Sequence, residues 1–178
     1  TTADFKIGLS AAATAANTIA EGDINFVISG GSSDDTITAG AGTDTLTGGA
    51  GSDSLTGGAG NDTLTSGGGD DNISGNDGND TISLGAASAA TKVVTVDGGA
   101  GNDTITMTSA TGYFNLSGGS DSDSFVVAGG TSIYFDSNDT LAGGDGTDTL
   151  TFAGTNGASY DLASNSAYLA NVTGMEAV

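Results

Sequence analysis

The residues in this chain most able to do chemistry are aspartates that recur every nine positions. From residue 30 the sequence divides into GGSSDDTIT, AGAGTDTLT, GGAGSDSLT, GGAGNDTLT, SGGGDDNIS and GNDGNDTIS, ending at residue 83. The sixth position of every unit is an aspartate: Asp35, Asp44, Asp53, Asp62, Asp71 and Asp80. Calcium prefers carboxylate and backbone carbonyl oxygens, six to eight of them at about 2.3–2.6 Å. The pattern therefore predicts a series of calcium sites.

Glycines at the first, second and fourth positions supply the turns that must hold these aspartates. Glycine permits positive φ, so a six-residue turn can wrap tightly with its carbonyl groups pointing inward. We expect the glycines of the regular turns to contribute to the metal sites: Gly48, Gly49, Gly51, Gly57, Gly58, Gly60, Gly98, Gly99, Gly101, Gly143, Gly144 and Gly146.

Each aspartate is followed by a short strand with one inward-pointing aliphatic residue. The aliphatic residues of the six units are Ile37, Leu46, Leu55, Leu64, Ile73 and Ile82. The threonines and serines beside them point outward, because successive side chains of a strand alternate between its faces. Two units make one coil of 18 residues, with a turn and a strand on each side. Stacked coils bring equivalent positions about 4.8 Å apart.

This unit resembles the G-G-x-G-x-D-x-U-x nonapeptide of RTX (repeats-in-toxin) proteins, in which U is aliphatic. The resemblance covers about 30–151 and is closest to the repeat region of a bacterial surface-layer or adhesin protein. It implies an all-β fold, a right-handed parallel β-roll or β-helix with calcium bound between turns of adjacent coils. It also implies one-step type I export, and hence a secreted, extracellular or bacterial cell-surface location.

Three further units begin at Gly98, Gly118 and Gly143, separated by irregular segments. If each segment is an enlarged unit on one side of the coil, its inward residue lies two positions before the next glycine pair. Those residues are all apolar, as is the residue before Gly30: Val96, Leu116, Leu141 and Ile28. One side of the roll should then carry an unbroken set of aspartates: Asp44, Asp62, Asp80, Asp103, Asp123 and Asp148.

Calcium held between equivalent turns of adjacent coils gives five sites on that side and two between Asp35, Asp53 and Asp71, about seven in all. Seven divalent ions would reduce the net charge of −20 to roughly −6. The alternative for any single aspartate is a solvated turn residue. It applies most to Asp103, Asp123 and Asp148, where turn glycines are partly replaced, as Asp121 replaces the fourth one. It applies similarly to Asp35, because Ser33 replaces a glycine in that turn, and Asp139 is a weaker candidate without glycines.

The composition excludes several classes of function. The chain has 22 acidic and two basic residues, so it repels nucleic acid and anionic membranes. It has no His and no Cys, which removes the usual zinc sites, a Cys nucleophile and a Ser-His-Asp triad. No apolar run approaches the roughly 20 residues that cross a bilayer. We therefore expect no enzymatic activity, no nucleic-acid partner and no membrane insertion.

Four regions follow from these patterns: a regular roll at 30–83, irregular coils with one-sided loops at 84–151, and two ends. Residues 1–29 are a cap or a degenerate first coil. The cap could be a short helix begun by Ser10, whereas a coil places Ile19 nine residues before Ile28. Residues 152–178 are a C-terminal cap or the lead-in to further coils, with apolar residues that include Tyr160, Leu162, Tyr168 and Leu169.

The expected function is that of a structural module that calcium folds and stiffens, as part of a secreted bacterial surface layer, filament or adhesin. Self-association or contact with neighbouring subunits would accompany that role. One alternative is a calcium-folding carrier domain of a type I-secreted enzyme. Another is ice binding by the outward rows of threonine hydroxyls.

Overall fold

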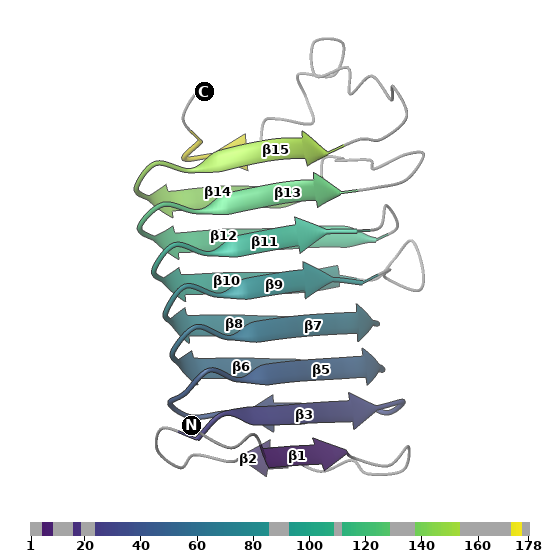
Figure 1. The fold of residues 1–178 in the computed structure, drawn as a ribbon. Helices are drawn as coiled ribbons and strands as arrows, with labels where there is room; N and C mark the ends of the chain where they lie inside the picture. Colours follow the sequence, from purple (N-terminus) through teal and green to yellow (C-terminus); the bar gives the residue numbers. More distant parts are fainter. Residues whose placement is uncertain are drawn as a thin grey trace.

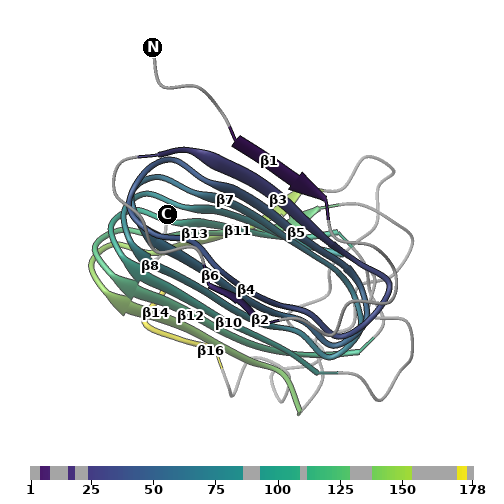
Figure 2. The ribbon, with the colours of Figure 1, turned by 90° about the horizontal axis from the view of Figure 1, so that it is seen from below.

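The computed structural model describes residues 5–8, 16–18, 24–85, 93–108, 112–128, 138–153 and 172–175. These residues form two parallel sheets of eight strands each, which face one another across a thin core (Figures 1 and 2). No helix occurs among them. In particular, none of these segments forms a helix long and apolar enough to cross a membrane.

The odd sheet contains the odd-numbered strands in the order β1-β3-β5-β7-β9-β11-β13-β15. Its strands are β1 Phe5–Gly8, β3 Phe26–Gly31, β5 Thr45–Ala50, β7 Thr63–Gly68, β9 Thr81–Leu84, β11 Thr104–Met107, β13 Ser124–Ala128 and β15 Thr149–Ala153. The even sheet has the order β16-β14-β12-β10-β8-β6-β4-β2. Its strands are β2 Ala16–Thr18, β4 Thr36–Thr38, β6 Ser54–Ala59, β8 Asn72–Asp77, β10 Val93–Ala100, β12 Tyr113–Ser120, β14 Thr140–Asp145 and β16 Val172–Thr173. The chain alternates between the sheets, so consecutive strands are coil neighbours, and strands two apart pair in parallel.

The predicted inward residues form the core. Every aliphatic residue of the six regular units is buried, as are the three predicted for the irregular coils: Ile37, Leu46, Leu55, Leu64, Ile73, Ile82, Val96, Leu116 and Leu141. The predicted register is confirmed, because Val96 pairs with Ile73 and Leu116, and Leu116 pairs with Leu141. Ile28 pairs with Leu46 as expected. The irregular segments therefore leave the stacking of the coils unchanged.

The extra residues of the irregular coils lie on one edge only. The connections β9–β10, β11–β12 and β13–β14, which all lead from the odd to the even sheet, are the long ones. Every connection back to the odd sheet, from β4–β5 to β14–β15, is a short turn. Figure 1 shows these short turns aligned along the left edge. All three of these connections thus run in the same direction, from the odd to the even sheet.

The two ends extend both sheets. Strand β1 pairs with β3 and β2 pairs with β4. A strand therefore lies within the segment for which a helix was one alternative, while Ser10 and Ile19 fall outside the described residues. At the other end β16 pairs with β14. Tyr160, Leu162, Tyr168 and Leu169 also fall outside the described part of the chain.

Candidate metal centres

The predicted aspartates form two buried columns, one on each edge of the roll. The short turns of the left edge in Figure 1 carry what we name the long column: Asp44, Asp62, Asp80, Asp103, Asp123 and Asp148. The opposite edge carries the short column: Asp35, Asp53 and Asp71. All nine carboxylates are at most 3% exposed. The structure therefore brings together every aspartate that the nonapeptide pattern singled out.

One oxygen of each carboxylate is used to join coils. The backbone N–H of Asp44 donates to Oδ1 of Asp62 at 2.7 Å, and Asp62 donates in the same way to Asp80. The series continues through the irregular coils, where Asp103 donates to Asp123 at 2.8 Å. Bonds of a backbone N–H to an ionised carboxylate are about twice as strong as neutral ones. The Oδ1 atoms therefore fix the register of the turns even where the coil length changes.

The second oxygen of the carboxylates is buried without such a bond. Oδ2 has no hydrogen-bond partner among the described residues at seven of these positions: Asp35, Asp44, Asp53, Asp62, Asp80, Asp103 and Asp123. A buried ionised carboxylate oxygen is costly unless it is paired, and the usual remedies are a proton or a cation. Because a buried Oδ2 without a hydrogen bond recurs from coil to coil, we take it as the feature that marks a candidate cation site.

The first glycine of a turn leaves a space beside this oxygen. A Cβ placed on Gly48 would lie 2.5 Å from the carbonyl oxygen of Ser66, in the next coil, and closer still to Asp53 Oδ2. Because no Cβ stands there, oxygens of two neighbouring coils converge beside the glycine, as the ligands of a shared cation must. We name this space, between Oδ2 and the next coil's carbonyl oxygen, the glycine cradle. It occurs at seven turns: Gly30, Gly48, Gly57, Gly75, Gly98, Gly118 and Gly143.

Other turn carbonyls also face the next coil. A Cβ on Gly67 would overlap the carbonyl oxygen of Gly49, and one on Gly69 would overlap that of Gly51. The second and fourth glycines of the regular turns all have positive φ: Gly49, Gly51, Gly58, Gly60, Gly99, Gly101, Gly144 and Gly146. Among the described residues, no group of three or more His, Cys, Asp or Glu side chains is placed to hold a metal ion by itself. Each site therefore combines one carboxylate with several backbone carbonyls, a donor set that fits calcium.

Two replacements of turn glycines preserve the turn, and one does not. Asn76 and Asp121 take the places of a second and a fourth glycine with φ of 73° and 75°. Asn and Asp are the non-glycine residues that best tolerate this region. Ser33 does not adopt positive φ, so the first turn differs in shape from the others. The turn that ends at Asp123 therefore keeps a positive φ at its fourth position, although Asp121 replaces the glycine there.

Two turns lack the glycine cradle because their first residue carries a Cβ. Ala39 occupies the first position of the turn that ends at Asp44, and Ser66 occupies that of the turn that ends at Asp71. Both residues are buried. The two aspartates lie in the columns with the others, yet the space beside them is already filled.

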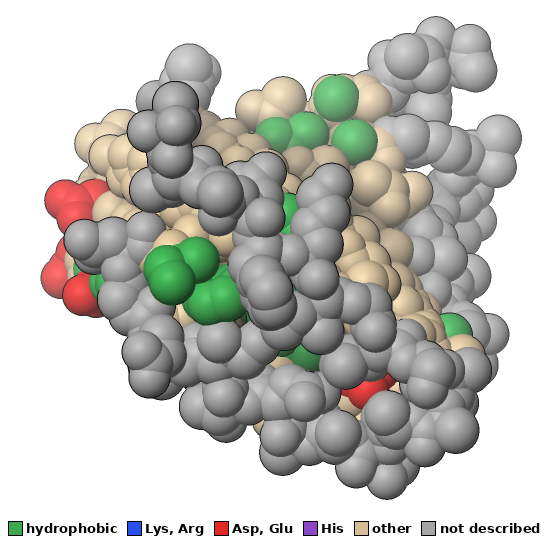
Figure 3. Space-filling view, turned by 60° about the horizontal axis from the view of Figure 1, so that its bottom comes forward, with side chains coloured by type: hydrophobic (Ala, Val, Ile, Leu, Met, Phe, Trp, Pro, Cys, Tyr) green, Lys and Arg blue, Asp and Glu red, His purple; other side chains and the backbone are tan. Residues whose placement is uncertain are grey.

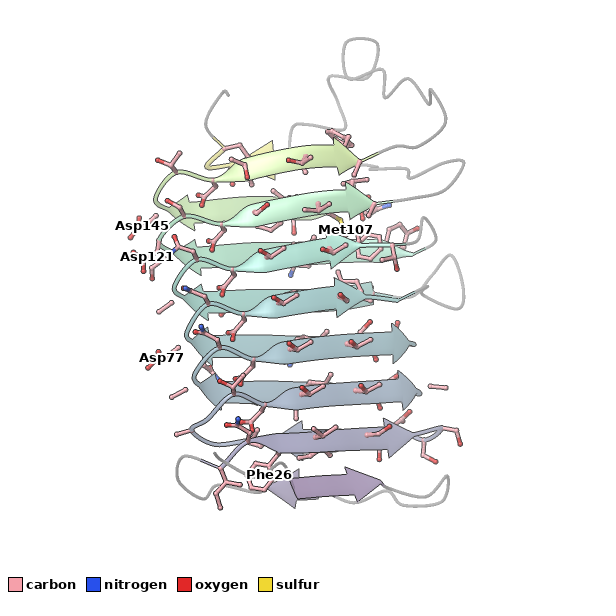
Figure 4. The ribbon with its side chains drawn as sticks, viewed as in Figure 1. Phe26, Asp77, Met107, Asp121 and Asp145 are labelled. Carbon is pink, nitrogen blue, oxygen red and sulfur yellow. The ribbon has the colours of Figure 1, made fainter. Side chains whose placement is uncertain are left out.

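The columns end at apolar residues. Phe26 precedes Asp44 in the long column, and its N–H donates to Asp44 Oδ1 at 2.7 Å (Figure 4). The short column stops after Asp71, because Val94 and then Phe114 occupy the next positions and are buried. Asp139 follows Phe114, whose N–H donates to Asp139 Oδ1 at 2.8 Å. Asp139 is therefore three coils away from Asp71, the nearest aspartate of the short column.

Further acids on the regular edge point away from the column. Asp77, Asp121 and Asp145 lie on the outside of these turns and are exposed (Figure 4). In Figure 3 most of the visible acidic side chains, drawn in red, lie together at the left margin of the molecule. The buried carboxylates thus form a set distinct from the solvated acids on the same edge.

Burial strongly perturbs the long column. Desolvation raises the pKa of Asp62 and of Asp103 to about 7, and neighbouring aspartates of the column add to the increase. The pKa of Asp123 rises to about 6 for the same reasons. The hydrogen bond from the preceding coil lowers each value, but by less than desolvation raises it. Without a cation beside them, these groups therefore hold protons close to neutral pH.

A second polar ladder was not predicted from the sequence. The fifth residue of a turn accepts a hydrogen bond from the backbone N–H of its counterpart in the next coil. Asn79 donates to Asn61 Oδ1 at 2.9 Å, Asn102 donates to Asn79 Oδ1 at 2.7 Å, and Ser122 continues the series. The signal was present, because Asn, Asp, Ser or Thr stands before nearly every column aspartate.

The family model of the RTX calcium-binding nonapeptide repeat matches this chain in four copies, at residues 27–55, 47–82, 95–106 and 135–157. Together the copies cover just over half of the chain. They include every column aspartate except Asp123, which holds its place in the ladder nonetheless. No curated protein and no solved structure matches the chain.

Proposed function

Because the chain belongs to the family of RTX calcium-binding nonapeptide repeats, we propose that it is a calcium-stabilised structural module of a secreted bacterial surface protein. Such a protein would form a surface layer, a filament or an adhesin. The observation that carries this proposal is the buried Oδ2 atom that has no hydrogen-bond partner among the described residues at seven column aspartates.

Calcium binding and folding are coupled in this proposal. The core consists of two opposed rows of side chains, one or two buried apolar residues per strand from β3 to β14, around which many glycines must be ordered. Ordering a residue costs about 1–2 kcal/mol, and glycine loses more freedom than any other residue. Stacked carboxylates add repulsion. Calcium bound between coils removes that repulsion and joins turns that few other side chains connect.

The glycine cradles support a count of seven calcium ions. They lie beside five aspartates of the long column and two of the short column: Asp62, Asp80, Asp103, Asp123, Asp148, Asp35 and Asp53. Asp44 and Asp71 remain outside this set, because Ala39 and Ser66 fill the corresponding space. In the proposed sites one carboxylate supplies charge, and the turn carbonyls of two coils complete the oxygen shell.

A secreted location suits this mechanism. Extracellular calcium modules bind at about 10⁻⁴–10⁻³ M, a concentration available outside the cell. The chain would remain loose before export and become rigid afterwards. The sequence contains no His and no Cys, so the rod itself is proposed to be structural rather than catalytic. Its regular edge keeps the ions in line, while the other edge offers surfaces to neighbouring subunits.

Electron microscopy with and without calcium tests the structural role. We expect sheets or fibres at millimolar calcium and none after chelation. A chain that stays monomeric by light scattering at millimolar calcium would argue against this role. Native mass spectrometry on the same samples would count the bound ions, with seven expected, and so separates calcium binding from assembly.

A second candidate, ice binding, is favoured by the outward face of the odd sheet. From β5 to β15, one column on this face consists of hydroxyl residues in register, whereas Val27 of β3 pairs with its first member: Thr45, Thr63, Thr81, Thr104, Ser124 and Thr149. A parallel column of hydroxyls beside it is interrupted only at Val126. Thermal hysteresis at millimolar calcium tests this function, with Thr81→Lys as a variant that should abolish it. Absence of hysteresis in the natural chain would eliminate it.

A further inference from the structure

We propose a calcium site at the C-terminal end of the long column, between the carboxylate of Asp148 and the carbonyl oxygen of Gly174. Gly174 lies outside all the nonapeptide units and outside the four matched segments. The inference rests on the proposed calcium-binding function. It extends that function to a residue that carries no part of the repeat.

The evidence is a glycine cradle at Gly143 that matches the internal ones. A Cβ on Gly143 would come closest to two oxygens, Asp148 Oδ2 and the carbonyl oxygen of Gly174. At the internal turn a Cβ on Gly118 would meet Asp123 Oδ2 and, at 2.5 Å, the carbonyl oxygen of Gly143. Gly174 therefore stands toward Asp148 as Gly143 stands toward Asp123.

The local backbone explains how a non-repeat residue reaches this position. Strand β16 pairs with β14 through Leu141 with Val172 and Ala142 with Thr173. This register places Gly174 where the next coil would begin its turn. Met175 then forms an isolated bridge with Asp148, so the chain passes directly from the first turn position to the aspartate position. The last coil supplies a carbonyl oxygen and has Met175 at the position where the other coils of this edge have an aspartate.

This site would hold the end of the roll closed. Strand β16 has only two residues, and a strand this short adds little stability of its own. Val172 and Met175 pack, partly buried, against the end of the core. An ion shared by Asp148 and Gly174 would fix these apolar side chains over Leu150 and its neighbours. Calcium would thus order the C-terminal cover as well as the coils.

The other end of the long column supplies a matched control. Asp44 is as buried as Asp148, and its Oδ1 accepts a hydrogen bond from Phe26. Its cradle position is filled by the Cβ of Ala39. The terminal aspartates thus share burial and differ in the space beside Oδ2. Only Asp148 should bind an ion.

Three variants, read by native mass spectrometry and hydrogen exchange, test the site: Asp148→Asn, Asp123→Asn and Asp44→Asn. Asn retains an oxygen for the hydrogen-bond ladder. We expect Asp148→Asn to lose one ion and to speed amide exchange at 172–175 by about tenfold or more at millimolar calcium. Asp123→Asn should also lose one ion, and Asp44→Asn should lose none.

The outcomes separate this inference from the proposed function. If Asp148→Asn keeps the full ion count while Asp123→Asn loses one, the terminal site is wrong and calcium binding by the coils stands. If Asp123→Asn also keeps the full count, the internal assignment fails too. Anomalous scattering from crystals of the natural chain with calcium needs no variant. A peak between Asp148 Oδ2 and the Gly174 oxygen supports the site, and its absence beside occupied internal turns overturns it.

Discussion

The turns on the regular edge carry an aspartate in every coil from Asp44 to Asp148, whereas the opposite edge stops after Asp71 and continues with Val94 and Phe114. The long insertions all lie on this second edge. A turn that shares oxygens with both neighbours cannot change length without losing them. The edge on which apolar residues replace the aspartates is free to accept loops. The difference teaches that, in the proposed sites, calcium ligation would restrict the length of a turn, whereas strand pairing tolerates coils of different lengths.

The same edge also explains how the roll keeps its register. Oδ1 of each long-column aspartate accepts a backbone hydrogen bond from the coil before it, across spacings of 18, 23, 20 and 25 residues. The insertions are absorbed elsewhere, and the ladder is continuous. The hydrogen bonds of the regular edge therefore keep the coils in register along the whole roll.

Insertions should give the largest difference between the two edges. We expect two residues, Gly-Ser, inserted within the Gly98–Asp103 turn to remove the ions on both sides of it. The melting temperature at millimolar calcium should fall by about 10 °C or more. The same insertion within 129–137, on the other edge, should change it by less than about 2 °C. Equal losses from the two insertions would break the distinction between the edges.

Removing one carboxylate should give the next largest effect. Asp103→Asn deletes a site with a glycine cradle, and at calcium about a hundredfold above its Kd that site contributes about 2.7 kcal/mol. Asp71→Asn, whose cradle is filled by Ser66, should change the free energy of unfolding by under about 1 kcal/mol. Chemical denaturation at fixed calcium measures both. A larger loss for Asp71→Asn would show that the cradle does not identify the sites.

Protons should compete with calcium on the long column. Its Asp62 and Asp103 have a pKa raised to about 7, so calcium must displace their protons at lower pH. Calcium affinity there should fall about tenfold per unit as pH drops from 7 to 5. For the metal-free fold the pH dependence has the opposite sign, because its stability falls as pH rises. A raised folded-state pKa contributes stability that is fully present below the unfolded value of 3.8 and is lost as pH rises through about 7.

Titrations of calcium at pH 5.5, 6.5 and 7.5, followed by carboxyl carbon shifts in NMR spectra, resolve these residues individually. Affinity that does not change over this range would contradict the proposed competition at Asp62 and Asp103.

The smallest predicted effect is a gain. Ala39→Gly opens the space beside Asp44, and a calcium ion should then bind between this turn and the next. Native mass spectrometry should show one more ion than the natural chain. Stability at millimolar calcium should rise by about 1–2 kcal/mol, less than a full site contributes, because glycine also increases the freedom of the unfolded chain. An unchanged ion count would show that the Cβ of Ala39 is not what prevents calcium from binding beside Asp44.

Much of the fold could be predicted because one short unit determines it. The spacing of Leu46, Leu64 and Ile82 gives the coil, and Val96, Leu116 and Leu141 carry its register through the irregular part. Period-two burial and glycine turns are local properties, so a single sequence displays them. The burial of all nine column aspartates follows from the same pattern.

The parts that could not be predicted depend on contacts between coils. The filled cradles at Ala39 and Ser66 require the position of a Cβ relative to a carbonyl oxygen one coil away. Gly174 has no repeat around it, so only the pairing of β16 with β14 brings it to Asp148. The end of the short column at Val94 also depends on pairing across an insertion.

Far-ultraviolet circular dichroism of the chain during a calcium titration, begun from exhaustively chelated protein at pH 7.5, tests the central claim most directly. If ions between coils hold the roll together, the β-sheet signal is absent at the start and appears cooperatively as calcium approaches the millimolar range. A chain that shows its full β-sheet signal before any calcium is added would contradict the account, because the apolar core alone would then suffice.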